Sequence, residues 1–138
     1  MRDPVLEEKL ESVRRCLERV RTRTPADVGD FARDLDAQDI VTINLERAVQ
    51  ACVDIALHVL VLREGAPRTM AEAFVCLAQQ RLISEPVAER MVKAVGFRNL
   101  AVHAYRQIDW NVVHSIATLH LEDFRSFMRE IVASNDLE

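Results

Sequence analysis

Apolar side chains recur every three or four positions along most of this chain, which is the period of an amphipathic α-helix. A β-branched run at residues 40–43 could pass for a strand, but the chain offers no partner strand. The sequence therefore predicts an all-α fold, an antiparallel (up-down) helical bundle of four to five main helices. The helices are expected at residues 4 to about 21, about 37 to 63, 70 to 82, 84 to 105 and 109 to 132, with a short helix or turn near residues 27–36.

Capping signals and helix breakers support these boundaries. Asp3 before Pro4 is a favourable cap and first-turn pair, and Thr69 with Glu72 has the spacing of a capping box. Gly65 and Pro67 are expected to end the long helix. Gly96 falls inside the helix at 84–105, where glycine costs about 1 kcal/mol relative to alanine. We expect it to permit a close approach or a slight bend.

Length and composition indicate one domain, residues 1–138. A chain of 138 residues with 49% hydrophobic residues can build one core. No basic region followed by an apolar run is present at the start, so no signal peptide is expected. The longest apolar stretch is far shorter than the ~20 residues of a membrane span. We therefore expect a cytoplasmic protein with no membrane association.

The candidate metal ligands in this sequence are its three cysteines and one Asp–His pair. Cys16, Cys52 and Cys76 lack the paired spacing of a zinc site and are expected to be buried free thiols. Asp54 and His58 lie four apart and could form a ligand pair, but a side-chain hydrogen bond on a helix-packing face is the favoured interpretation. No metal site and no cofactor are expected.

The charge distribution restricts nucleic-acid binding to a local site. A formal net charge of −4 argues against broad nonspecific binding of polyanions. Positive charge nevertheless gathers on the first helix and around residues 84–108. Arg14 and Arg15 are possible RNA-binding residues, although a solvated face is the simpler interpretation.

Residues 97–106 carry an unusual polar set on one helix face. At ~100° per residue, Arg98, Asn99, His103, Tyr105 and Arg106 fall within an arc of roughly 160°. Arginine presents planar donors suited to phosphate, and histidine can take and give a proton near neutral pH. Val92, Val95 and Val102 are expected on the same side, so this face should meet a partner. The combination suggests chemistry on a phosphodiester, with Arg106 as a further possible RNA contact.

The run GFRNLAVHAY resembles the signature of the HepT-like toxins, a branch of the HEPN ribonucleases. Arg98, Asn99, His103 and Tyr105 match the signature, and residues 45–60 and 69–84 resemble the family's second and third core helices. The resemblance implies an endoribonuclease toxin whose composite cleft forms in a homodimer. It also implies a cognate minimal nucleotidyltransferase antitoxin, with AMPylation at Tyr105 as a means of control.

In this interpretation Arg98, Asn99 and His103 are catalytic and act on an RNA substrate. Attack by the RNA 2′-hydroxyl would leave a cyclic phosphate, and no cluster of carboxylates accompanies the motif in sequence to hold metal ions. The alternative is a noncatalytic helical module that binds a nucleotide, an RNA or a protein through the same face. Tyr105 has an alternative role too, in which its ring packs at the dimer interface and its hydroxyl bonds a neighbour.

Overall fold

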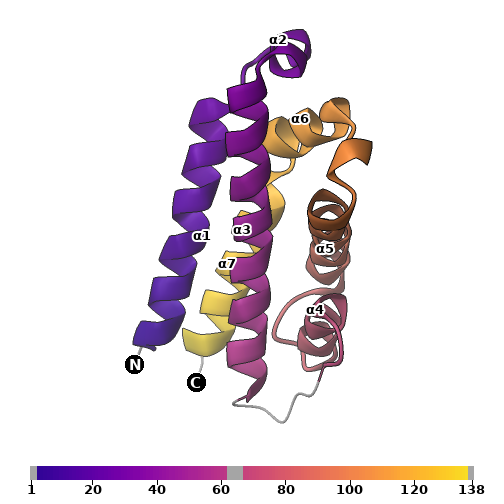
Figure 1. Cartoon of the computed structure of the whole chain (residues 1–138). Helices are drawn as coiled ribbons and strands as arrows, with labels where there is room; N and C mark the ends of the chain where they lie inside the picture. The colour runs from indigo at the N-terminus through magenta and orange to yellow at the C-terminus, as the bar shows by residue number, and fades with distance from the viewer. Residues whose placement is uncertain (1–2, 62–66, 137–138) are drawn as a thin grey trace.

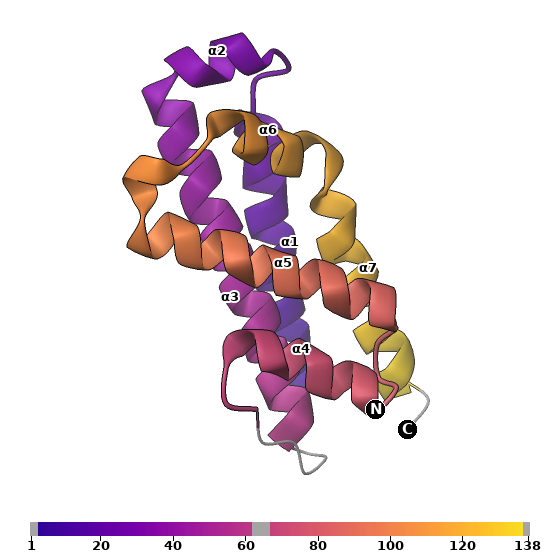
Figure 2. The same cartoon turned by 90° about the vertical axis from the view of Figure 1, so that its right-hand side faces the viewer.

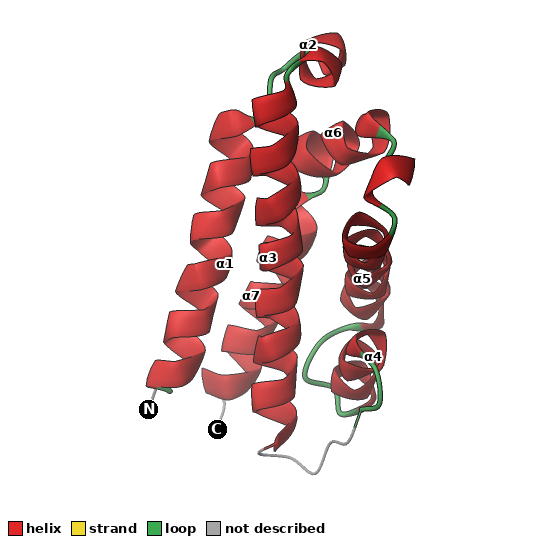
Figure 3. Ribbon diagram, viewed as in Figure 1, coloured by secondary structure: helices red, strands yellow, loops and turns green. Residues whose placement is uncertain are grey.

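The computed structural model describes residues 3–61 and 67–136, and all regular structure within them is helical (Figure 3). This agrees with the predicted all-α bundle. The helices are α1 (Pro4–Arg23), α2 (Val28–Arg33), α3 (Leu35–Val61), α4 (Met70–Gln79), α5 (Glu85–His103), α6 (Trp110–Leu119) and α7 (Leu121–Asp136), with a 3₁₀ turn, η1 (Tyr105–Gln107), between α5 and α6.

Helices α1 and α3 run side by side, with α7 behind them (Figure 1). Helix α5 lies obliquely across α3, with its N-terminal end near α7 and its C-terminal end on the opposite side (Figure 2). The core between these helices is apolar, and its largest fully buried side chains include Phe31, Phe74, Phe127, Leu10, Leu45 and Met91. Edge-to-face ring pairs join distant elements: Phe74 with Phe127 at 5.3 Å, and Phe31 with Trp110 at 5.7 Å.

The predicted helix starts are confirmed by their capping bonds. The Asp3 carboxylate accepts from the amides of Val5 and Leu6, at 2.9 and 3.4 Å. The Thr69 hydroxyl accepts from the Glu72 amide at 3.1 Å, whereas the Glu72 carboxylate accepts from the Arg68 amide, so the reciprocal bond of a capping box is not formed.

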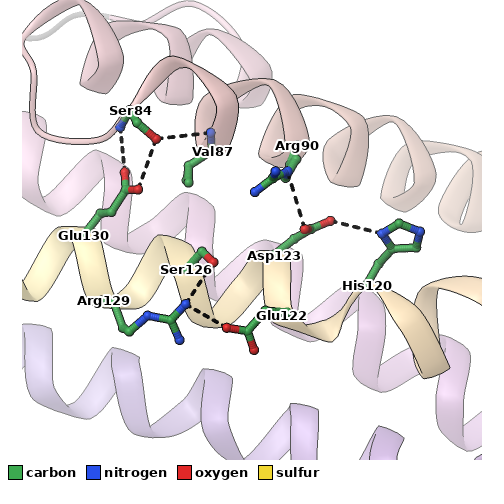
Figure 4. Close-up of polar contacts among 9 residues, drawn as sticks. All are labelled: Ser84, Val87, Arg90, His120, Glu122, Asp123, Ser126, Arg129 and Glu130. Carbon is green, nitrogen blue, oxygen red and sulfur yellow. Dashed lines mark hydrogen bonds and ion pairs between the residues drawn. The ribbon is translucent and has the colours of Figure 1, made fainter.

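Helix α5 is tied to α7 at its N-terminal end. The Glu130 carboxylate accepts from the Ser84 amide at 2.6 Å and from the Ser84 hydroxyl at 3.0 Å (Figure 4). The same hydroxyl accepts from the Val87 amide in the first turn. These bonds satisfy donors that a helix start leaves free, and they fix the position from which α5 crosses the bundle.

Three predicted helices differ in the structure. The helix predicted to reach residue 82 ends at Gln79, and Arg81 has a left-handed φ of 60°. The last helix is interrupted at His120, whose φ and ψ of −118° and 10° end α6 before α7 begins. The helix predicted to reach Tyr105 ends at His103, because Ala104 has an extended φ of −141°. Tyr105 therefore belongs to η1, and the direction predicted for its side chain from a continuous helix does not apply.

The three cysteines are free, as predicted, whereas Asp54 and His58 do not form a pair with each other. Cys16, Cys52 and Cys76 are free, with Cys16 and Cys52 buried, and burial raises the pKa of the Cys52 thiol. Asp54 and His58 do not pair: Asp54 accepts from Gln50 at 3.1 Å, and His58 pairs with Asp3, the N-cap residue of α1.

Of the two glycines expected to shape helices, Gly96 is described by the structure and Gly65 is not. Gly65 and the predicted end of the long helix at residue 63 lie outside the described residues. A side chain added at Gly96 would meet nothing within 4 Å, so no close approach occurs there within the described chain. None of the described helices combines the length and apolar character needed to cross a membrane.

Candidate functional site

The motif residues lie where α5 passes the edge of α3. In the first half of α5, Met91 and Val95 are buried in the core, at 0% and 3% exposure. The same helical stripe continues to Arg98 and Val102, because these positions follow at spacings of three and four. Val102 is 45% exposed, so the stripe is no longer fully covered there. Val95 thus belongs to the core rather than to the partner-facing surface predicted for it.

Arg98 and Asn99 are joined by a hydrogen bond. Nη1 of Arg98 donates to the side-chain oxygen of Asn99 at 3.2 Å. Arg98 also lies near Glu46 of α3: burial raises the pKa of Glu46, and the positive charges of Arg98 and Arg47 oppose that rise. The Arg98 guanidinium is therefore bonded to the Asn99 side chain in the neighbourhood of the Glu46 carboxylate, with further donors available to an anion.

His103 is the last residue of α5 and its side chain is exposed. Within residues 3–61 and 67–136, no hydrogen bond or ion pair to its imidazole is observed. Both ring nitrogens can therefore approach a ligand.

Tyr105 is held by two contacts from different elements. Its hydroxyl donates to Oδ1 of Asp39 in α3 at 3.0 Å, and its ring meets Trp110 of α6 edge-on at 6.0 Å. Burial raises the pKa of the Tyr105 phenol, and the hydrogen bond and charge of Asp39, with the charge of Glu46, raise it further. The charge of Arg98 thus affects Glu46, and the charge of Glu46 affects Tyr105, so the two motif side chains lie near the same part of α3.

Asp39 and Glu46 are site residues that the sequence did not predict. Both lie on α3, two helices before the motif in the chain, and neither was predicted to lie beside it. The two residues are seven apart and so share one face of α3, which is the signal that could have marked them. Among the described residues, no group of three or more His, Cys, Asp or Glu side chains is placed to hold a metal ion.

The remaining predicted residues are dispersed. Arg106 is exposed in η1, beside the motif. Arg14 and Arg15 are exposed on α1, on the other side of α3 from α5 (Figure 1). Arg14 pairs with Glu11 at 3.5 Å. The structure therefore brings Arg98, Asn99, His103, Tyr105 and Arg106 to one end of α5 and leaves Arg14 and Arg15 apart.

Comparison with known proteins gives a consistent family match. The sequence profile of the family described as "Ribonuclease HepT-like" matches residues 13–131. The mRNA nuclease HepT of Shewanella oneidensis is 36% identical over 126 residues, which cover 91% of this chain and 94% of that protein. The tRNA nuclease HepT of Aphanizomenon flos-aquae is 28% identical over 92% of this chain and 87% of its own length.

Solved structures share the fold over nearly the whole chain. The tri-AMPylated HEPN toxin of Shewanella oneidensis, in complex with MNT antitoxin, has a TM-score of 0.90 at 34% identity and covers 96% of this chain and 99% of its own. A toxin–antitoxin complex with AMP-PNP has a TM-score of 0.89 at 34% identity, over 95% and 99% of the two chains. The cytosolic protein YutE of Bacillus subtilis, at 12% identity and a TM-score of 0.82, is similar in fold.

Proposed function

Because the chain belongs to the HepT-like ribonuclease family, we propose that it is a cytoplasmic, metal-independent endoribonuclease toxin restrained by a nucleotidyltransferase antitoxin. The observation that carries the proposal is the arrangement at the end of α5. An exposed imidazole with no partner among the described residues lies one turn beyond an Arg98–Asn99 pair. Such a set can bind a phosphodiester and move a proton beside it.

The reaction uses the RNA 2′-hydroxyl as the nucleophile. The 2′-oxygen forms a bond to phosphorus while the bond from phosphorus to the 5′-oxygen breaks, which leaves a 2′,3′-cyclic phosphate and a 5′-hydroxyl. Arg98 holds the phosphate and stabilises its developing charge. His103 takes the proton of the 2′-hydroxyl or supplies one to the leaving 5′-oxygen, and Asn99 orients Arg98 through the observed hydrogen bond.

One copy of His103 serves only one of these two proton transfers at a time, so two copies make a complete acid–base site. Apolar side chains surround the motif: Ile43, Leu100 and Val102 are 40%, 39% and 45% exposed. Ile43 lies between Asp39 and Glu46 on the same face of α3. A homodimer formed through this surface would cover these side chains and bring the two motifs into one cleft.

AMPylation of Tyr105 would inactivate the site by a local electrostatic change. The modified oxygen can no longer donate to Asp39, and the added phosphate carries a negative charge next to Asp39 and Glu46. Repulsion from these carboxylates would drive the phosphate away from α3, and Arg98 is the nearby cation that attracts it. The AMP group would then compete with RNA for Arg98. The tri-AMPylated relative in complex with its MNT antitoxin supports this mode of control.

The decisive experiment compares toxicity and RNA cleavage in matched variants. We expect Arg98→Ala and His103→Ala to lose growth inhibition and to cut RNA at least ~10²-fold more slowly. A positioned acid or base such as His103 contributes about that much, and so does a group such as Arg98 that stabilises the developing charge. Arg68→Ala, which removes an exposed cation at the start of α4, should stay active. Circular dichroism verifies folding, and cleavage should persist in EDTA.

Two results would overturn this function. Wild-type protein that leaves diverse RNAs intact without any partner present would favour the noncatalytic binding module. Complete loss of cleavage in EDTA would refute the metal-independent reaction.

The control mechanism has its own test. The chain is coexpressed with a nucleotidyltransferase of the family's antitoxin type and weighed intact. We expect a mass gain of one or more AMP units that maps to Tyr105 and is absent in Tyr105→Phe. An unmodified but inhibited toxin would instead indicate inhibition by complex formation.

A further inference from the structure

A pocket of about 330 Å³ opens between α3, α5, α6 and α7. It lies on a different face of α5 from the motif. Its apolar lining includes the fully buried Leu45 and Val49, the buried Phe124, and the partly buried Phe97 and Ile116. Ligand pockets usually measure about 300–1,000 Å³. The volume therefore suits one small ring system, such as a nucleobase with its sugar.

The rim of this pocket is polar and incompletely paired. Asp123 lies between Arg90 and His120 (Figure 4), with Nε···Oδ1 and Nδ1···Oδ2 separations of 3.7 and 3.5 Å. Both exceed the ~2.7–3.2 Å of an ordinary hydrogen bond. Asp123 therefore keeps the capacity to accept from a ligand N–H group.

Lys93 completes the rim from α5 and is exposed. Across the described ranges, no hydrogen bond or ion pair to its ammonium is observed. The arginines that line the larger hollow between α1 and α7 differ, because each is paired with a glutamate: Arg14 with Glu11, and Arg125 and Arg129 with Glu122. The pocket beside α5 thus combines an apolar floor with a cation available to an anionic ligand.

These groups together match a nucleotide. A flat base can lie against Phe97 on the apolar floor, and its amino group can donate to Asp123. The attached phosphate can contact Lys93 and Arg90. The pocket rim thus has two cations against one carboxylate, although the whole chain has a formal net charge of −4.

The outer surface of α5 connects the pocket to the motif. At ~100° per residue, the order around the helix is Lys93, Gly96, His103. Gly96 is exposed, and a side chain there would meet nothing within 4 Å. A nucleic-acid backbone can therefore cross α5 close to its main chain, between the pocket and His103.

We propose that this pocket binds one unpaired nucleobase of the RNA substrate and makes cleavage selective for the nucleotide that it accepts. The inference rests on the proposed ribonuclease function, since that function supplies an RNA at His103. The chemistry of the pocket would also suit a free mononucleotide, so the test has to separate the two sources.

The first arm measures binding directly, without any cleavage. AMP, GMP, CMP and UMP are titrated in turn into the full-length His103→Ala chain, and its amide NMR signals are followed. At least one nucleotide should saturably shift signals of residues 90–97 and 120–124. Lys93→Ala should weaken that binding roughly fivefold, as expected for loss of one partly exposed charge contact, and Arg68→Ala should leave it unchanged. No shift in these segments at millimolar nucleotide would overturn the proposal.

The second arm reads cleavage preference on a random-sequence single-stranded RNA. Wild-type protein should favour one base at a fixed offset from the cut, and both Lys93→Ala and the pocket-filling Ala94→Leu should flatten that preference. Arg68→Ala should retain it. Cleavage whose preference is unchanged in both pocket variants would overturn the pocket proposal alone. A chain that binds a mononucleotide but cuts no RNA would overturn the proposed function and leave a free-nucleotide site.

Discussion

At the residue scale, the chemistry of Tyr105 depends on a distant part of the sequence. Asp39, which accepts its hydroxyl hydrogen bond, is 66 positions away in the chain. The partner stabilises the neutral phenol and places a negative charge beside any phenolate that forms. The same contact therefore fixes the ring and keeps its oxygen protonated.

Asp39→Asn should lower the pKa of Tyr105 toward its ordinary value of about 10, because the charge of Asp39 is removed while burial remains. The chain has a single tyrosine, so the ultraviolet absorbance of the phenolate reports this group alone. A folded pKa above the unfolded value stabilises the protein below that unfolded value. This contribution is lost as the pH rises through the folded pKa. An unchanged titration in Asp39→Asn would show that burial and the charge of Glu46 raise the pKa without a contribution from Asp39.

The common placement of Arg98, Asn99 and His103 could be predicted because they lie on one helix, where spacing determines direction. Asp39 and Glu46 could not be assigned to the site in this way. Their proximity to Tyr105 and Arg98 is set by the crossing of α3 and α5, which is a tertiary contact that local periodicity does not encode.

At the element scale, most helix starts follow from local capping chemistry, whereas two helix ends do not. Residues 109–132 contain no glycine or proline, so their apolar periodicity reads as one helix. The structure divides them at His120, and the signal for a new start is Glu122 with Asp123 in the first turn of α7. Helix α5 ends before Tyr105. The contacts of Tyr105 with Asp39 and Trp110 lie in a direction that a continued α5 would not give its side chain.

Gly96 offers a test of helix propensity within α5. Alanine there should stabilise the protein by about 1 kcal/mol, because the position is mid-helix and exposed and a new methyl group meets nothing within 4 Å. Thermal unfolding should show a rise of a few degrees.

Gly29→Ala is the matched control for that substitution. A methyl group at Gly29 would lie 2.9 Å from the Asp27 carboxylate, which caps α2 by accepting from the Asp30 amide. No comparable gain is expected there. Equal stabilisation by both substitutions would indicate an effect on the unfolded chain rather than on α5.

At the scale of the whole molecule, the crossing of α5 over α3 explains why the motif and an apolar side chain are exposed together at this edge. The N-terminal half of α5 is covered by the core and tied to α7 through Glu130, so its stripe of apolar residues is buried. The C-terminal half carries the same stripe past α3, where Val102 remains uncovered beside Arg98. Because apolar surface left exposed in this way often marks an interaction site, we expect a second molecule of this chain to cover it.

Substituting one exposed apolar residue on this surface should separate the two protomers. Wild-type protein is expected to have about twice the 15.7 kDa chain mass by light scattering after size exclusion. Val102→Asp should yield a folded monomer, because like charges would face each other across a two-fold interface. It should also lose RNA cleavage, since each motif supplies half of the proposed site.

Leu119→Asp provides the matched control, because Leu119 is 72% exposed at the end of α6 and is not part of the motif surface. It introduces the same charge in place of an exposed aliphatic side chain, and it should leave both the dimer and its activity intact. A wild-type monomer at micromolar concentration that still cleaves RNA would contradict the composite cleft. A monomeric Val102→Asp chain that remains active would show that one copy of Arg98, Asn99 and His103 is sufficient.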